Sequence, residues 1–371
     1  MTENSYICSL LLDPSNYIPD TLNLNADEEA RQYWFDCFGQ LIKKFSEQAA
    51  RSEHFRNSDA EERAKRYYDD CMEIIHTIRD DNDRKKAITI RNLLEISDSC
   101  LRLNGFHDPW LEEKRTENAI SLSKLPERLA ELDRIAHRPS KWMEIFKGVF
   151  AGNIFDWGAL AVAEILENNE SFGLNDALKQ IQPRPWLIDG FDAWIKRLEG
   201  PSHNCAIIFV DNSGIDFILG ILPFSRELLN RGTKIIFCAN KEPSLNDITV
   251  QEMETVLKQC CDKCNIIKNA YETQQILIIP NGQNSACLDL RHISPELNEA
   301  IKTENIDLVV IEGMARALHT NLNAKFKCES LKLAVIKNKW LANRLGGETF
   351  SIICKYETPM NRTNDINDVN Q

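Results

Sequence analysis

The spacing of apolar residues changes about halfway along the chain. Up to about residue 200, apolar side chains recur three or four positions apart between charged ones, as in the stretch 59–91, where Tyr67, Cys71 and Ile75 share one stripe. This period is typical of amphipathic helices. It predicts a helix within 59–91 and further helices over 26–50, 84–103, 110–135, 140–151 and 156–168.

From about residue 204 the pattern becomes short apolar runs rich in β-branched residues. Helix-length segments separate most of these runs, which cover 205–210, 234–239, 275–280, 307–312, 333–337 and 350–355. Apolar strands that alternate with helices are typical of a parallel sheet covered on both faces. Two helix starts can also be located, because Thr249 and Glu252 have the spacing of a capping box and Ser294 precedes a proline.

These patterns predict an α/β protein in which a three-layer α/β/α domain with a mostly parallel sheet follows a helical N-terminal region. We expect residues 1–200 to form the helical region, which packs on the site and contributes to it. Residues 201–357 form the α/β core. The polar segment 358–371 has the composition of a disordered tail.

Composition narrows the class of partner. The net charge of −12 argues against a nucleic acid, whose phosphates are bound mainly by basic residues. A small phosphate ester remains possible if a few cations and a metal gather locally. No apolar run reaches the roughly 18 residues of a membrane span, and the N-terminus lacks the pattern of a signal peptide. The twelve scattered cysteines are therefore expected as reduced thiols in the cytoplasm.

Polar residues gather where the predicted strands end. The first strand leads into 211–214, the second reaches 246–247, the fourth leads into 312–316 with His319 close behind, and the fifth ends at Lys337. Ligands of open parallel sheets bind beyond the carboxyl ends of the strands. Each segment alone has a plainer interpretation, namely a capped turn, a loop before a helix, a Glu312–Arg316 pair or a solvated lysine. Their convergence at one sheet edge favours a site.

The residue types at this edge suggest phosphoryl chemistry. Asp211, Asn212 and Asp247 offer oxygen ligands, which suit a divalent ion such as magnesium or manganese. Arg316 and Lys337 offer cationic donors for phosphate oxygens. Residues 213 and 214 would begin the next helix, whose unpaired backbone N–H groups would add an anion site. A metal, cations and a helix start around one anion are typical of phosphoryl transfer.

Other signals are weaker. The cysteines 260, 261 and 264 include a C-x-x-C, but no second pair or histidine lies at a zinc spacing, which favours structural thiols. The glycine patterns of nucleotide-binding loops are absent. A haloacid-dehalogenase phosphatase needs a second aspartate two residues after the first, and that position holds Ser213.

Several long segments resemble one known family. They are AGNIFDWGA (151–159), RPWLID (184–189), FVDNSGID (209–216), PFSRELLNRGT (223–233), LNDIT (245–249), DLVVIEGMARALHTN (307–321) and ESLKLAVIKNKWLANRLGG (329–347). Together they extend over more than half of the chain and resemble the damage-control phosphatases, a family of metal-dependent phosphatases. Within that family they are most similar to the branch that acts on phosphopantetheine.

The resemblance implies roles for individual residues. Asp211, Asn212 and Asp247 would hold the divalent ion, with manganese, nickel or cobalt favoured and magnesium as an alternative. Asn153 and Asp156 would enter the same cleft from the helical region. The full set of expected substrate or phosphate contacts is Asn153, Asp156, Ser213, Glu312, Gly313, Met314, Arg316, Asn321 and Lys337.

The resemblance also implies a substrate. It points to 4′-phosphopantetheine, especially its oxidised or damaged forms, whose dephosphorylation would withdraw them from coenzyme A synthesis in a stand-alone phosphatase without a kinase half. One departure is Ala315, where the branch has glycine in Glu-Gly-Met-Gly-Arg; its methyl group is tolerated only at negative φ. A carboxyl methyltransferase of the same family and a weakly catalytic sensor of pantetheine phosphates remain alternatives.

Overall fold

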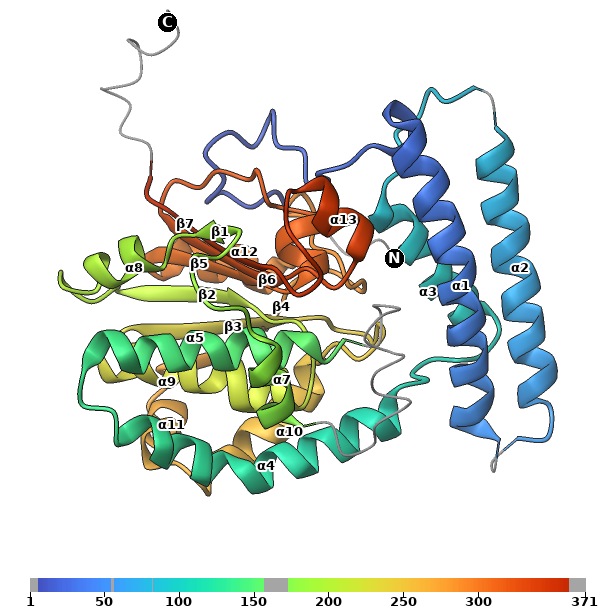
Figure 1. Ribbon diagram of the computed structural model, residues 1–371. Helices are drawn as coiled ribbons and strands as arrows, with labels where there is room; N and C mark the ends of the chain where they lie inside the picture. Colours follow the sequence, from blue (N-terminus) through green and yellow to red (C-terminus); the bar gives the residue numbers. More distant parts are fainter. Residues whose placement is uncertain (1–5, 55–56, 82, 157–172, 360–371) are drawn as a thin grey trace, which may run out of the picture.

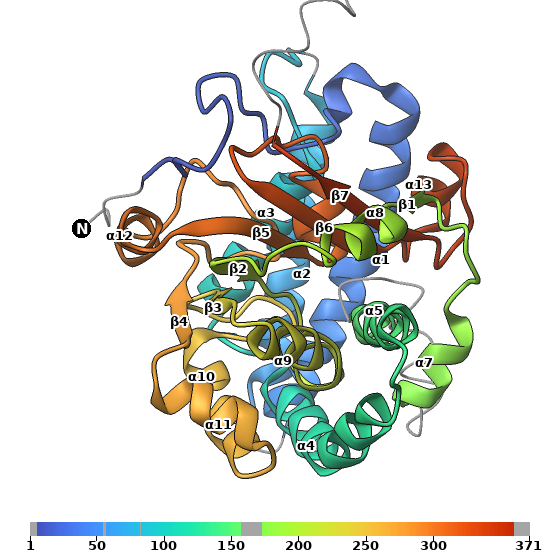
Figure 2. The ribbon, with the colours of Figure 1, turned by 90° about the vertical axis from the view of Figure 1, so that its left-hand side faces the viewer.

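The computed structural model describes residues 6–54, 57–81, 83–156 and 173–359. Its centre is a seven-stranded sheet in the order β1-β7-β6-β5-β2-β3-β4 (Figures 1 and 2). The strands are β1 Ile188–Asp189, β2 Cys205–Phe209, β3 Lys234–Ala239, β4 Ile276–Pro280, β5 Ile306–Glu312, β6 Glu329–Val335 and β7 Ile352–Glu357. Every neighbouring pair is parallel except β6 and β7. The predicted, mostly parallel sheet is thus confirmed.

Helices precede the sheet and connect its strands. Before β2 lie η1 Leu24–Ala26, α1 Glu28–Glu53, α2 Ala60–Asp80, α3 Ile90–Leu103, α4 Leu111–Asp133, α5 Arg138–Ile154, α7 Leu174–Gln180 and α8 Phe191–Arg197. After β2 lie η2 Asp216–Ile221, α9 Leu222–Asn230, α10 Val250–Cys261, α11 Asn265–Glu272, α12 Pro295–Thr303, η3 Met314–His319 and α13 Lys339–Arg344. Both η2 and η3 are single π-helical segments.

The two helix starts located in the sequence are confirmed. Thr249 and Glu252 form a complete capping box at the start of α10. Ser294 accepts a hydrogen bond from Leu297 N at the start of α12, with Pro295 as the first helical residue. These caps matter for the site, because Thr249 fixes the end of the loop that contains Asp247.

Each face of the sheet has its own hydrophobic core. Along β2, Ala206 and Ile208 point into a core shared with α4, α5, α9, α10 and α11. Ile207 and Phe209 point into the opposite core, which includes α1, α3 and α12. This alternation is the pleat of a strand buried on both faces. It confirms the three-layer α/β/α arrangement (Figure 1).

The N-terminal residues are joined to the C-terminal part by backbone pairing. Isolated antiparallel bridges connect Tyr6 with Ile293, Leu11 with Phe326, and Asp20 with Thr320. Helices α1 and α2 then lie side by side at one end of the sheet (Figure 1). The expected helix over 59–91 is wrong beyond Asp80, and α3 begins only at Ile90 after a Thr89 cap.

Several other expectations can be compared with the described residues. The division at residue 200 stays a prediction, although β1 places residues 188–189 in the sheet. The helix expected over 156–168 and the tail after 359 lie outside the described residues. All twelve cysteines are free thiols, including those at 260, 261 and 264. No helix in the described segments combines the length and hydropathy that crossing a membrane requires.

Candidate functional site

The loops after β2 and β3 are held together by their backbones. Asn212 and Asp247 form an antiparallel bridge. Ile248 N donates to Asp211 O at 3.1 Å, and Ser213 N donates to Asn246 O at 3.0 Å. Asp211, Asn212 and Asp247 are therefore brought together at the carboxyl ends of the strands, as the sequence predicts.

Arg316 lies between two of these acids. Its guanidinium donates to Asp211 and, at 2.6 Å, to Asp247. Burial alone would lower the pKa of Arg316, but the two carboxylates raise it, so the side chain stays charged. The guanidinium pairs with these acids rather than with Glu312, which the sequence offered as an alternative. Arg316 is fully buried and does not line the pocket described below.

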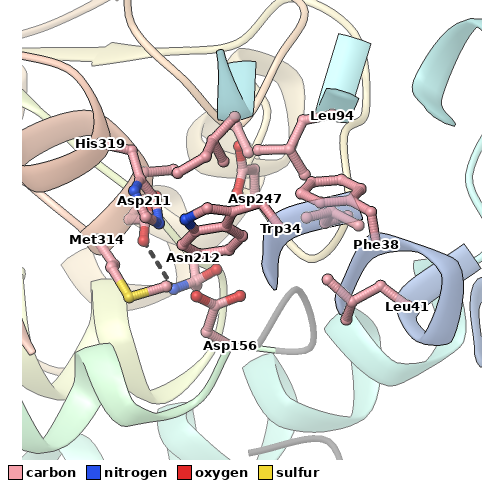
Figure 3. Close-up of a pocket in the computed structure, with 14 residues that line it drawn as sticks. Trp34, Phe38, Leu41, Leu94, Asp156, Asp211, Asn212, Asp247, Met314 and His319 are labelled. Carbon is pink, nitrogen blue, oxygen red and sulfur yellow. Dashed lines mark hydrogen bonds between the residues drawn. The ribbon is translucent and has the colours of Figure 1, made fainter. Parts of the chain in front are cut away.

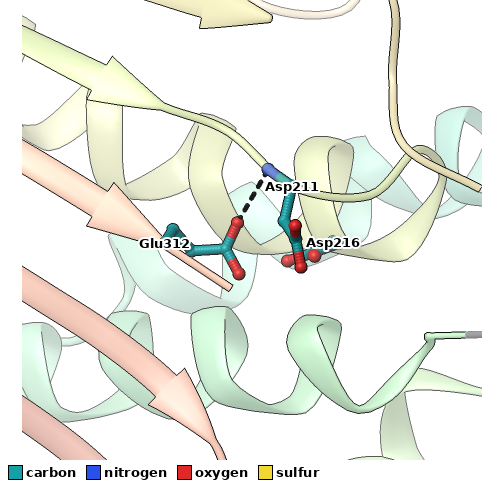
Figure 4. A group of neighbouring side chains, drawn as sticks. All are labelled: Asp211, Asp216 and Glu312. Carbon is teal, nitrogen blue, oxygen red and sulfur yellow. Dashed lines mark hydrogen bonds between the residues drawn. The ribbon is translucent and has the colours of Figure 1, made fainter. Parts of the chain in front are cut away.

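Asp211 also belongs to a second group of buried acids, whose other members do not line the pocket described below. Asp211, Asp216 and Glu312 each place a carboxylate oxygen within 4.8 Å of the others (Figure 4). Glu312 accepts from Asp211 N at 3.0 Å, and Asp216 accepts from Asn212 Nδ2 at 2.9 Å. Asp216 was not expected from the sequence. In the sequence it has the appearance of an ordinary acid at the start of a helix, and nothing there indicates its place in the cluster.

The electrostatics of the site fit a divalent cation. Burial, with added repulsion between the acids, raises the pKa of Asp216 to about 7 and that of Asp247 to about 8. Burial also raises the pKa values of Asp211 and Glu312. These four acids and Asp156 are all buried, and two buried cations, Arg316 and Lys337, form ion pairs within the group. Among the described residues, Asp216 Oδ1 has no hydrogen-bond partner.

Asn153 and Lys337 connect helix α5 to the sheet. Asn153 Nδ2 donates to Glu312 at 2.6 Å and to Asp211 at 3.2 Å, while its Oδ1 accepts from Val335 N. Lys337 Nζ lies 2.7 Å from both Asn153 O and Asp156 Oδ2. The Lys337 side chain is fully buried, so the alternative of a solvated lysine is wrong. Both residues fix the acids in place and neither lines the pocket.

The segment after β5 approaches Asp211 closely. Gly313 has a φ of 106°, and a Cβ at this position would lie 2.3 Å from Asp211 Cγ. Met314 lines the pocket, and its Sδ accepts from Lys337 N at 3.3 Å. Ala315 lies inside η3 and is not among the described residues with positive φ, so its methyl group causes no backbone strain there.

The backbone N–H groups of Ser213 and Gly214 are paired within the protein, with Asn246 O and Asn118 Oδ1, so they do not form a free anion site. The Ser213 hydroxyl is buried without a hydrogen-bond partner among the described residues, and its phosphate contact stays a prediction. The Asn321 amide donates to Leu288 O and Arg316 O and accepts from the Tyr17 hydroxyl. These bonds give Asn321 a structural role at the end of η3.

The acids open into a pocket that has two chemically different ends (Figure 3). Its polar end consists of Asp156, Asp211, Asn212 and Asp247. Its apolar wall comes mainly from the N-terminal region and consists of Trp34, Phe38, Leu41, Ile90 and Leu94, joined by Leu245 and Ala286. Met314, Ala315 and His319 from η3 complete the lining. The pocket contains about 480 Å³ of empty space, its open mouth included.

Comparisons with known proteins identify similar sequences and a similar fold. Residues 35–353 match the damage-control phosphatase ARMT1-like domain. The chain is 34% identical to a damage-control phosphatase of Arabidopsis thaliana, and the match covers 87% of each chain. A crystal structure of a DUF89 family protein from Pyrococcus horikoshii matches with a TM-score of 0.56 and 15% identity, over 85% of this chain and 96% of the other. That likeness concerns the fold alone.

Longer relatives also match. The chain is 39% identical over 94% of its length to a 4′-phosphopantetheine phosphatase of Mus musculus, of which the match covers 48%. It is 35% identical to pantothenate kinase 2 of Arabidopsis thaliana, of which the match covers 41%. The chain thus spans about half the length, or less, of these curated relatives.

Proposed function

The chain belongs to the damage-control phosphatase family with an ARMT1-like domain, and on this premise we propose that it removes the phosphate from 4′-phosphopantetheine. We include oxidised or otherwise damaged forms of this ester, whose loss would limit coenzyme A synthesis from them. The observation that carries the proposal is the pocket that joins a buried acidic end to an apolar wall. The mouse relative named 4′-phosphopantetheine phosphatase supports the choice of substrate.

The two-ended pocket suits a long phosphate ester. 4′-Phosphopantetheine has a phosphate at one end, then a carbon that bears two methyl groups, then a hydroxyl and two amides before its thiol. A compact sugar phosphate has no apolar part to place against Trp34, Phe38 and Leu41.

We propose that Asp211, Asn212 and Asp247 hold the divalent ion. All three line the pocket, whereas Asp216 and Glu312 lie behind Asp211 and do not. A catalytic ion needs a coordination position open to the substrate, which favours the residues that face the pocket. Such an ion polarises phosphoryl oxygens and lowers the pKa of bound water. We expect manganese, nickel or cobalt, with magnesium as the alternative.

The remaining residues fix this arrangement. Arg316 holds Asp211 and Asp247 at a set separation through its two hydrogen bonds. Lys337 holds Asp156 at the pocket wall. Pre-positioned groups of this kind need no reorganisation during the reaction. We therefore regard Arg316, Lys337, Asn153 and Glu312 as positioning residues.

We also propose that the protein works in the cytoplasm. Its twelve cysteines are free, and all of them lie at buried or half-buried positions in or against the two hydrophobic cores, where oxidation would disturb the packing. Free thiols persist in a reducing compartment.

The experiment is a phosphate-release assay with each of the four metals. We expect a kcat/KM for 4′-phosphopantetheine that far exceeds those for fructose 6-phosphate and ribose 5-phosphate, and no turnover after chelation. Equal turnover of the sugar phosphates would contradict the substrate. Binding without turnover would favour a sensor, and methyl transfer from S-adenosylmethionine to a carboxylate would favour the methyltransferase alternative.

A further inference from the structure

His319 is a buried polar side chain without a polar partner. It belongs to η3 and lines the pocket, and only 6% of its surface is exposed. Among the described residues, none forms a hydrogen bond with either ring nitrogen. The ring nitrogens are not among the described atoms that are both fully buried and without a partner, so they are open to the pocket, where a ligand can form hydrogen bonds with them.

The protein holds this ring in a fixed place. Its backbone carbonyl accepts from Thr21 N and Thr21 Oγ1, both at 3.0 Å. The imidazole meets the Trp34 ring edge-on, with centroids 5.2 Å apart and an interplanar angle of 86°. The N-terminal region therefore positions His319 from two sides. A ring held so firmly is suited to select a ligand by geometry.

The imidazole is neutral at physiological pH. Burial and, to a smaller degree, the charge of Lys337 lower the pKa of His319 to about 4. A neutral imidazole offers one N–H donor and one nitrogen acceptor. It therefore matches a ligand group that both accepts and donates, such as a hydroxyl or a secondary amide, and it does not match a carboxylate or a phosphate as well as a cation would.

His319 lines the pocket together with residues of both ends. Its ring contacts Trp34 of the apolar wall, and Asp211 and Met314 line the same pocket (Figure 3). A ligand whose phosphate sits at the acids would place the atoms just beyond its ester carbon near this ring. In 4′-phosphopantetheine these atoms are two methyl groups followed by a hydroxyl and an amide.

We propose that His319 is a specificity-determining residue that hydrogen-bonds the hydroxyl–amide part of the pantetheine chain, while Trp34 packs against the adjacent methyl groups. This rests on the proposed function, because it assumes a pantetheine phosphate in the pocket. It goes further by assigning the polar contact that distinguishes pantetheine phosphates from simple phosphate esters such as phenyl phosphate. A site that hydrogen-bonds a substrate hydroxyl or amide discriminates strongly against esters that lack it.

The first test uses pantetheine, the product without phosphate, and calorimetry. We expect His319→Phe, which keeps the ring but removes both nitrogens, to weaken pantetheine binding about tenfold. We expect His319→Gln, which keeps a donor and an acceptor, to lose less. The control is His76→Phe, at an exposed position of α2, which should bind as the unaltered protein does. Equal affinities for the unaltered protein and His319→Phe, or no pantetheine binding at all, would overturn the inference.

The second test separates this inference from the proposed function. The ratio of kcat/KM for 4′-phosphopantetheine to kcat/KM for phenyl phosphate should fall at least tenfold in His319→Phe; an unchanged ratio overturns the inference. If no ester is hydrolysed, the proposed function fails, and pantetheine binding still decides the role of His319. If His319→Phe does not fold, NMR of the protein with ¹⁵N-labelled histidines replaces the binding measurement on that variant. Pantetheine must then shift the ring resonances that are missing in His319→Gln, and unshifted resonances overturn the inference.

Discussion

Ser244 donates its hydroxyl proton to the buried carboxylate of Asp98 at 2.7 Å, and this bond joins helix α3 to the loop that carries Asp247. The same loop is held from within, because Asp247 N donates to Ser244 O at 3.1 Å. Leu245, between them, has a φ of 50°, a conformation that needs support from its surroundings. The helical N-terminal region thus supports the proposed metal loop as well as the pocket wall.

Asp98→Asn should change how stability depends on pH. Burial, opposed by the Ser244 hydrogen bond, raises the pKa of Asp98 from 3.8 to about 7. A carboxyl that binds its proton more tightly in the folded chain destabilises the fold as pH rises from about 4 to about 7, with each pKa unit worth about 1.4 kcal/mol. Asparagine still accepts from Ser244 but cannot ionise. The variant should therefore be more stable at pH 8, with an advantage that shrinks toward pH 4.

Urea unfolding at a series of pH values measures this difference. Asp262→Asn, at an exposed position after α10, is the control and should show little pH-dependent change. A constant difference between Asp98→Asn and the unaltered protein at all pH values would contradict the assigned pKa.

The sheet was largely predictable because its strands are buried on both faces. Runs such as 205–210 and 234–239 are apolar throughout, which distinguishes them from the amphipathic helices. The direction of β7 was not predictable, because an apolar run is the same whether its neighbour is parallel or antiparallel. The bridges from Tyr6, Leu11 and Asp20 were missed for a similar reason, since isolated pairs leave no periodic pattern.

The site was predictable as a location but not as a set of contacts. Asp211 and Asp247 follow strands and Glu312 ends one, so the topology brings them together. The pairing of Arg316 depends on the direction of its side chain, which sequence does not give. Asp216 has the appearance of an ordinary acid in the first turn of a helix. Only its burial beside Asp211 and Glu312 reveals its place in the cluster.

Gly313→Ala should displace Asp211 and abolish most metal-dependent activity. The added Cβ would lie 2.3 Å from Asp211 Cγ, and the φ of 106° is unfavourable for alanine. Gly346→Ala is a matched control, because Gly346 also has a positive φ but nothing lies within 4 Å of its Cβ position. It should lose about 1 kcal/mol of stability from backbone strain and keep its activity. Thermal unfolding and phosphate release distinguish the two, and an active Gly313→Ala would contradict the close approach.

The ion could bind at the pocket or among Asp211, Asp216 and Glu312. The variants Asp247→Asn and Asp216→Asn should distinguish these two positions. If the ion binds at the pocket, Asp247→Asn weakens manganese binding by at least tenfold and removes most turnover, while Asp211 still pairs with Arg316 and keeps the loop folded. Asp216→Asn should retain measurable manganese binding, because Asp216 does not line the pocket. Calorimetric titration with manganese is the measurement. The reverse result would place the ion among Asp211, Asp216 and Glu312.

Lys337→Met should destabilise the protein as well as slow the reaction. It removes the buried ammonium partner of Asp156 and the donor to Asn153 O. Breaking a buried ion pair by removing one partner typically costs about 3–5 kcal/mol. We also expect at least a tenfold loss of kcat/KM. Lys339→Met, at an exposed position two residues later, should change stability by no more than about 0.5 kcal/mol. Equal unfolding midpoints for the two variants would contradict the structural role of Lys337.

Phe38→Ala should erode the preference for 4′-phosphopantetheine over sugar phosphates. Phe38 lies on the apolar wall beside Trp34, in the pocket that the acids also line (Figure 3). Binding energy from the non-reacting part of a substrate can be realised as rate, so the loss should appear in kcat/KM. Phe45→Ala is the matched control, because Phe45 lies two turns later on α1, is equally buried and packs against Trp110 away from the pocket.

Both phenylalanine variants should lose about 3–5 kcal/mol of stability, because each leaves a cavity in the same core. Stability alone therefore cannot explain a difference between them. The ratio of kcat/KM for 4′-phosphopantetheine to kcat/KM for ribose 5-phosphate should fall at least tenfold in Phe38→Ala and stay near its original value in Phe45→Ala. If both variants keep the original ratio, the apolar wall does not select the substrate. If both lose it, the effect comes from a loosened core and not from a contact with the pantetheine chain.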